Sequence, residues 1–160
     1  MISEVFVEGC EDYFSCTNIG FQRFRIEIMR GWNQELGELF QRHYSYLWEK
    51  QGNIGSFFQM LELFQKKQSS EDLIKINKIL NEYDKPYNEG MKIFAYISDN
   101  EGEITPKECA LLLKSFERVD PDKFDNSDMK NNEWLRKSYD TWMKMMVHSI
   151  ENNKSIIFSK

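Results

Sequence analysis

The chain has 160 residues, a length that suits one domain of the common ~100–150-residue class better than two. Hydrophobic residues make up 41% and there are only 8 glycines and 3 prolines, which excludes collagen-like, low-complexity and wholly disordered chains. The formal net charge of −5 opposes binding to nucleic-acid phosphates. We therefore expect residues 1–160 to form a single globular domain, with a basic protein as a more suitable partner than nucleic acid.

The cysteines and the N-terminal residues indicate in which cellular compartment the protein is found. Cys10, Cys16 and Cys109 include no C-x-x-C pair, which argues against a disulfide framework and a zinc ribbon. The first residues lack the features of a signal peptide, and no stretch approaches ~18 uninterrupted apolar residues. These observations predict a cytoplasmic protein that does not enter a membrane.

The first half of the chain predicts mostly helices. Residues 4–8 are compatible with a short strand or an apolar arm, and a helix follows from about residue 18. Gly31 and Gly37 weaken that helix, so it is either one rod or two helices at an angle. Further helices are predicted at 56–68 and at 69–85, whereas 87–97 is a buried helix or a buried strand. The apolar stripe of the first helical segment comprises Phe21, Phe24, Ile28, Trp32, Leu36, Leu39, Phe40 and Leu47.

The second half carries clearer boundary signals. Thr105, Pro106 and Glu108 are typical of a helix N-terminus, and residues 120–122 close that helix. A long amphipathic helix is predicted from Ser127 or Asp128 to Asn152. Residues 156–158 suit a strand that pairs with the N-terminal strand or with a short strand at 103–104. The fold predicted is mainly α within the α+β class: five or six helices with a small antiparallel sheet near the chain termini.

The segment from Asp99 to Glu108 resembles part of an EF-hand loop. With Gly102 at the sixth position, Asp99, Glu101 and Glu108 occupy the third, fifth and twelfth positions, which supply calcium ligands. Ile97 falls at the first position, where an oxygen ligand is required. The alternative is structural: Gly102 makes a turn and Glu108 caps a helix. No other cofactor is expected.

A second group of carboxylates comprises Asp120, Asp122, Asp125 and Asp128. A calcium loop is not favoured, because no glycine stands at the required position. The simplest interpretation is a solvated loop that precedes a helix N-terminus. Such a loop presents negative charge, so Asp120, Asp122 and Asp125 are candidates for contact with a basic partner.

Arg23, Arg25 and Arg30 lie beside aromatic residues at the start of the first helix. Arginines among aromatics can stack on bases or bind an anion, which makes Arg23 and Arg25 candidate partner-binding residues. In the alternative, the aromatics face the core and the arginines pair with Glu27 and Glu35. The methionines at 143, 145 and 146 likewise suit core packing, or an adaptable interface.

No catalytic residues are predicted. His43 and His148 are the only histidines, and neither has a second histidine, cysteine or acid at H-x-x-x-H spacing. The chain contains no G-x-S-x-G, P-loop, G-x-G-x-x-G or C-x-x-C motif. An enzyme built on this chain would have to be of an unusual kind, and we favour a non-catalytic protein.

Two motifs carry a resemblance. Residues 20–25, Gly-Phe-Gln-Arg-Phe-Arg, are similar to a G-F-x-x-F-R helix start, and residues 98–109 are similar to S-D-C-D/E-G-x-I/L-T-P-E-E-C. Together they resemble a loosely defined set of small uncharacterised bacterial and bacteriophage proteins, over about half of the chain. Asn100 stands where that set often has cysteine, and the section between Trp32 and Pro86 is longer here. The resemblance implies a shared small domain and a bacterial or phage source, but no activity.

The function expected is a cytoplasmic, non-catalytic module that binds another, basic protein. Immunity proteins of toxin systems and phage-encoded inhibitors of host defence have this size and sign of charge, and an acidic surface speeds capture of a basic target. The alternative is a metal- or small-ligand-binding protein that uses Asp99, Glu101 and Glu108. A third interpretation is nucleic-acid binding through Arg23, Arg25 and Arg30. It predicts that the binding affinity falls steeply as the salt concentration rises. The oligomeric state is not predicted.

Overall fold

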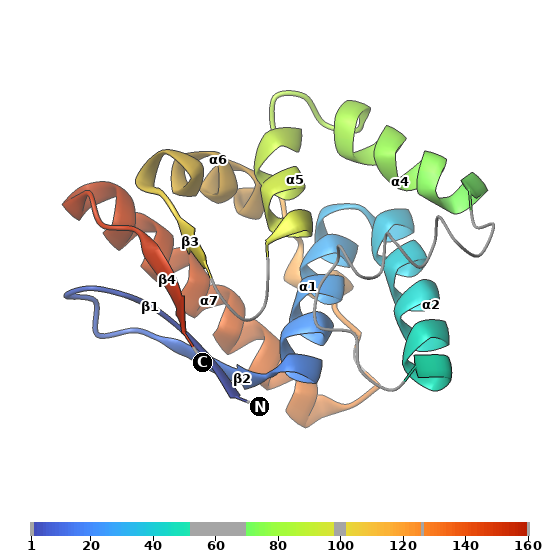
Figure 1. Cartoon of the computed structure of the whole chain (residues 1–160), viewed down its shortest axis with the longest axis horizontal. Coiled ribbons are helices and arrows are strands. Elements are labelled where there is room, and N and C mark those ends of the chain that lie inside the picture. Colours follow the sequence, from blue (N-terminus) through green and yellow to red (C-terminus); the bar gives the residue numbers. More distant parts are fainter. Residues whose placement is uncertain (1, 52–69, 98–101, 126, 160) are drawn as a thin grey trace.

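The computed structural model describes residues 2–51, 70–97, 102–125 and 127–159. Within these ranges it contains six helices, one 3₁₀ turn and a four-stranded antiparallel sheet, which confirms the predicted α+β class (Figure 1). The predicted helix at 56–68 lies outside the described residues. The elements in chain order are β1 (Ile2–Val7), β2 (Phe14–Thr17), α1 (Asn18–Trp32), α2 (Gln34–Gln51), α4 (Ser70–Glu82), α5 (Asn88–Tyr96), β3 (Gly102–Ile104), α6 (Pro106–Glu117), the 3₁₀ turn η1 (Pro121–Lys123), α7 (Met129–Asn152) and β4 (Ile156–Ser159).

The sheet has the strand order β2-β1-β4-β3, so the C-terminal strand lies between the other two predicted strands. β4 therefore pairs with both candidates, β1 and β3. Glu4 lies opposite Ser159, which brings the two ends of the chain together (Figure 1). Val5 and Val7 are buried whereas Phe6 is partly exposed, as expected for a sheet packed on one face.

One strand, β2, was not predicted. Its Phe14 is buried opposite Val5 of β1, and the burial of Phe14–Thr17 alternates along the strand. Four residues give too few alternations to be recognised in sequence. β2 is fixed by pairing with β1 and by the packing of Phe14, both of which depend on the tertiary fold.

The first helical segment is two helices that meet at Asn33. The Asn33 backbone N–H donates to the Met29 carbonyl and ends α1, and its side-chain oxygen accepts from the Leu36 N–H at 2.9 Å and begins α2. A Cβ on Gly37 would lie 2.5 Å from the Cα of Arg30, so glycine permits the close approach of the two helices.

Residues 88–96 form a helix, so the segment 87–97, for which a buried helix and a buried strand were both possible, is helical.

The boundary signals of the second half are confirmed. Thr105 and Glu108 form a reciprocal capping box at the start of α6, with Pro106 in the first turn. Asp128 is the N-cap of α7, and its carboxylate accepts from two backbone N–H groups of the first turn. These local hydrogen bonds need no tertiary contact, which explains why sequence alone identifies them.

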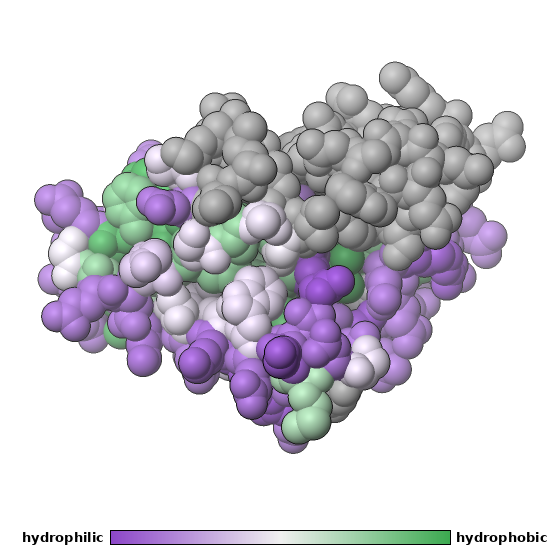
Figure 2. Space-filling view, turned by 90° about the horizontal axis from the view of Figure 1, so that it is seen from below, coloured by the Kyte–Doolittle hydropathy of each residue, from purple (hydrophilic) through white to green (hydrophobic). Residues whose placement is uncertain are grey.

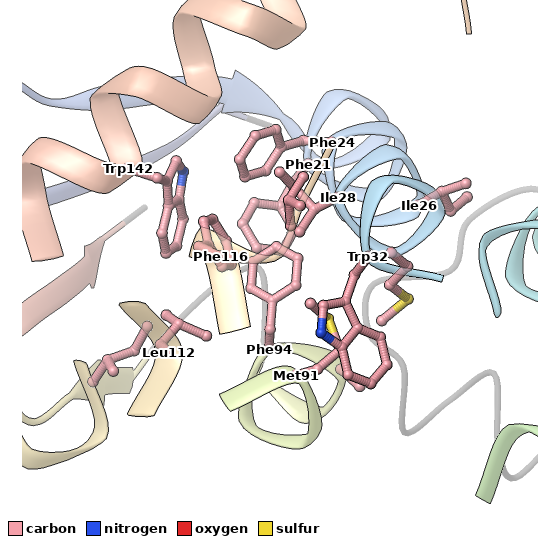
Figure 3. Close-up of a cluster of buried hydrophobic side chains, with 14 of the residues drawn as sticks. Phe21, Phe24, Ile26, Ile28, Trp32, Met91, Phe94, Leu112, Phe116 and Trp142 are labelled. Carbon is pink, nitrogen blue, oxygen red and sulfur yellow. The ribbon is translucent and has the colours of Figure 1, made fainter. Parts of the chain in front are cut away.

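The core is aromatic and centres on Trp142 of α7, which is fully buried. Figure 3 shows Phe21 and Phe24 of α1, Phe94 and Phe116 close to this indole, whereas Ile26 points to the other side of α1. The ring centroids of Phe24 and Phe94 each lie 5.8 Å from that of Trp142. The buried apolar residues thus form one shared core. Across the described residues, no helix is both long enough and apolar enough to span a membrane.

Candidate functional site

Four aspartates lie on the segment between α6 and α7, which we call the acidic segment (residues 120–128). All four are exposed, and three bind backbone N–H groups close to themselves. Asp120 accepts from the N–H of residue 122 at 3.0 Å, Asp125 from that of residue 127 at 2.9 Å, and Asp128 from that of residue 130 at 3.0 Å. These hydrogen bonds hold the carboxylates in defined positions.

The acidic segment is attached to α1 by backbone hydrogen bonds and by a buried ring. The Asp120 N–H donates to the Gly31 carbonyl at 2.9 Å, and the Asp125 N–H donates to Oε1 of Glu27 at 3.0 Å. Phe124, between them, is 2% exposed. A Cβ on Gly31 would lie 2.7 Å from Cγ1 of Val119, so the absence of a side chain lets the segment approach α1.

A third attachment joins the segment to α7. Arg136 donates to the Asp122 carboxylate at 2.8 Å and to the Pro121 carbonyl at 3.3 Å. Its Nε also donates to Asn132 one turn earlier. Asp122 remains 86% exposed, so this ion pair contributes little stability, but it fixes the direction of the carboxylate.

Glu27 is the buried charge beneath the segment, at 5% exposure. Its two carboxylate oxygens accept from Nη1 of Arg30 at 2.6 and 2.7 Å. Burial raises the pKa of the Glu27 carboxyl, against the opposing effects of the Asp125 N–H and of Arg30. The pKa of Asp125 is lowered, chiefly by its hydrogen bonds from Ser127, so Asp125 is anionic at neutral pH.

A recess of about 380 Å³ lies between α1, the acidic segment and the start of α7. Two of the predicted partner-binding residues, Arg23 and Asp125, line it together although they are far apart in sequence. Figure 2 views the molecule from the side where β2 and the starts of α1 and α7 lie, and hydrophilic residues cover most of the described surface there. The lining combines apolar side chains with a polar rim: Arg23, Ile26, Glu27, Gln41, Asp125, Ser127, Asp128, Asn131 and Leu135.

Arg25 requires a correction. The sequence placed it among the partner-binding candidates, but its side chain is only 1% exposed. It donates to the carbonyls of Ala95 at 3.0 Å and Ile97 at 2.6 Å, and its guanidinium lies 5.0 Å from the ring centroid of Phe21. Arg25 therefore holds the end of α5 against α1 and is not available to a partner. Arg30 pairs with Glu27, as the structural alternative predicted.

The metal-binding alternative gains no support from the described residues. Asp99 and Glu101 lie outside them, and Oε1 of Glu108 accepts from the N–H and the hydroxyl of Thr105 in the capping box. Among the described residues no three histidines, cysteines or acids come together as a group that could hold a metal ion. His148 hydrogen-bonds through Nε2 with the Glu8 carbonyl at 3.1 Å.

Sequence reasoning missed how the site is assembled. Glu27 accepts from the backbone of residue 125, a separation of 98 positions, and no spacing in the sequence indicates such a pair. Gly31 appeared only as a residue that weakens a helix, and its packing against Val119 was not expected.

Comparisons with protein-family models, curated protein sequences and solved structures find no match.

Proposed function

We propose that this protein is a non-catalytic module that binds a basic protein through the acidic segment. The observation that carries the proposal is that the segment is built before any partner arrives. Three of its carboxylates are held by local hydrogen bonds and that of Asp122 by Arg136. Its backbone is attached to α1 at Asp120 and Asp125 and anchored by the Phe124 ring.

Preorganisation matters because association normally costs about 0.5–1.5 kcal/mol for each flexible side chain that becomes ordered. Short aspartates that already accept backbone hydrogen bonds avoid much of this cost. Excess negative charge on the segment also steers a positively charged partner toward it and raises the association rate. Four aspartates against Lys123 give the segment a formal charge of −3.

The neighbouring recess adds specificity to this surface. Its apolar floor includes Ile26 and Leu135, which are 6% and 2% exposed, and its rim is polar. Such a combination allows a side chain of the partner to enter and fixes its orientation. Arg23 is exposed on the same rim, so a partner that fits must offer an acceptor there and cannot be uniformly basic.

We also propose to which biological class of binding protein this chain belongs. The resemblance of the two sequence motifs favours a bacterial or phage source, and the size and acidic charge fit an immunity protein or an inhibitor of host defence acting in the cytoplasm. These proteins act by occupying a surface of their target and need no catalytic group. The proposal therefore accounts for the lack of recognised catalytic motifs.

The experiment compares the wild-type protein with a variant carrying Asp120→Asn, Asp122→Asn and Asp125→Asn. Asparagine keeps the capping hydrogen bonds and removes the charge. Each protein is tagged, expressed in a bacterial host and purified, and co-purifying proteins are identified by mass spectrometry. We expect one stoichiometric basic protein with the wild type and its loss with the variant.

A matched control neutralises three exposed acids elsewhere, with Glu117→Gln, Glu133→Gln and Asp140→Asn. The two variants have the same net charge, so retention of the partner by the control separates a specific surface from overall charge. The proposal is refuted if the basic partner is retained equally by both variants, or if no partner is recovered with the wild type.

A further inference from the structure

A second groove lies between the exposed side of α7 and the turn that connects β1 to β2. We propose that this outer groove binds a basic amphipathic helix of a partner protein. Its volume is about 590 Å³, and it shares no lining residue with the recess beside the acidic segment. The groove is lined by Gly9, Cys10, Glu11, Asp12, Met143, Lys144, Val147, His148 and Glu151.

The floor of the outer groove is apolar. Met143 and Val147 are one turn apart on α7, and Ile150 follows three residues later on the flank of the same stripe. Val147 is 40% exposed and Ile150 is 39% exposed, whereas the neighbouring Met145 and Met146 are fully buried in the core. α7 thus carries a second apolar stripe beside its core face. The methionine side chain in the floor can adapt to the shape of an incoming side chain.

The rim of the outer groove is mainly acidic. Glu11, Asp12 and Glu151 line it, against the single ammonium group of Lys144. Glu8 lies on the adjoining turn but is engaged with Lys154 at 3.6 Å. An apolar stripe bordered by carboxylates complements a helix that has leucine-like anchors on one face and lysine or arginine beside them.

The wall formed by the turn is fixed in position. Gly9 has φ 82°, in the left-handed region, and the Cys10 N–H donates to the Val7 carbonyl at 3.0 Å. The His148 imidazole of α7 hydrogen-bonds with the Glu8 carbonyl, which joins the turn to the helix. The groove therefore exists without a partner, and little ordering is needed when one binds.

The same geometry favours a helix over an added strand as the occupant. Strand addition requires an unpaired sheet edge, and the two edge strands of this sheet are β2 and β3. Neither contributes a residue to the outer groove, which is lined by the turn between β1 and β2 and by α7. The stripe from Met143 to Ile150 extends about 10 Å along α7, since each helical residue rises ~1.5 Å. A partner helix of two to three turns, roughly 7–11 residues, would match this length.

Cys10 provides a direct readout, because it is half-buried within the groove and Cys16 lies outside it. The probe is a synthetic helical peptide of about four turns, with leucines at positions i, i+3, i+4 and i+7 and lysines elsewhere. The rates at which a maleimide modifies Cys10 and Cys16 are followed by mass spectrometry. We expect the rate at Cys10 to fall about tenfold when the peptide is near ten times its Kd, with Cys16 unchanged.

Two variants test the named contacts. Val147→Gln should weaken peptide binding about tenfold, since it removes a central apolar anchor. Ile74→Gln, at a residue 66% exposed on α4, should leave the affinity unchanged. The variant neutralised at Asp120, Asp122 and Asp125 should still bind the peptide here, so failure of the outer groove and failure of the acidic segment are distinguishable.

Several results would overturn the proposal. These are equal protection of both cysteines, no protection of Cys10, unchanged affinity in Val147→Gln, and equal protection by a peptide with glutamates in place of lysines. Sedimentation of the protein alone supplies the last criterion. Self-association that Val147→Gln abolishes would show that the occupant is a second copy of this chain.

Discussion

Gly31→Ala tests whether the acidic segment depends on its close packing against α1. The added Cβ would lie 2.7 Å from Cγ1 of Val119 and 2.9 Å from the carbonyl oxygen of Asp120, where ordinary carbon–carbon contacts are ~3.5–4.0 Å. The segment would have to move away by about 1 Å. Overpacking of this kind costs about 1–3 kcal/mol, and the better helix propensity of alanine offsets up to about 1 kcal/mol of that.

We therefore expect a net loss of about 1–2 kcal/mol in the free energy of unfolding, measured by urea denaturation. Amide exchange at Asp120 should accelerate by more than global stability explains, because its N–H donates to Gly31. Adding Val119→Ala removes one of the two clashes, so the double variant should cost less than the sum of the single variants. A stabilised Gly31→Ala protein, or strictly additive effects, would refute the packing argument.

Three further variants test the remaining structural claims. Because burial raises the pKa of Glu27, the stability that its protonated carboxyl contributes is full below the ordinary pKa of 4.5 and is lost as the pH rises through the raised pKa. The free energy of unfolding of Glu27→Gln, measured by urea denaturation, should therefore rise relative to that of the wild type as the pH increases above 4.5. Arg25→Leu leaves two carbonyls without their donor and should cost about 2–5 kcal/mol, whereas Arg25→Lys should recover part of this; equal stability of both would contradict the assigned role. Trp142→Ala should cost about 3–5 kcal/mol by calorimetry, and a cost below about 1 kcal/mol would show that the indole is not the centre of the core.

Much of the fold could be predicted because its signals are local. The capping box at Thr105 and the N-cap at Asp128 are complete within a few residues, and both occur where expected. The stripe from Phe21 to Phe40 predicts the buried face of the first two helices for the same reason. β2 was missed because its four residues are held in place by β1 and the core and carry too short a pattern.

The candidate site was only partly predictable. The exposed carboxylates of the acidic segment follow from composition, but their attachment through Glu27 and Gly31 depends on a contact between distant parts of the chain. For Arg25 the sequence predicted a partner-binding role that the structure does not bear out, because the side chain is buried. An arginine among aromatics has the same sequence pattern whether it binds a partner or supplies buried carbonyls with donors, and only the position of α5 distinguishes the two.

Site-specific photo-crosslinking shows directly whether the acidic segment contacts a basic protein. A photoreactive phenylalanine analogue replaces Lys123, which is exposed in the middle of the segment, and in a second protein it replaces Ile74 on α4. After irradiation in a bacterial host, we expect one crosslinked basic protein from position 123 and none from position 74. Crosslinks of equal yield to the same protein from both positions, or no crosslink from position 123, would contradict it.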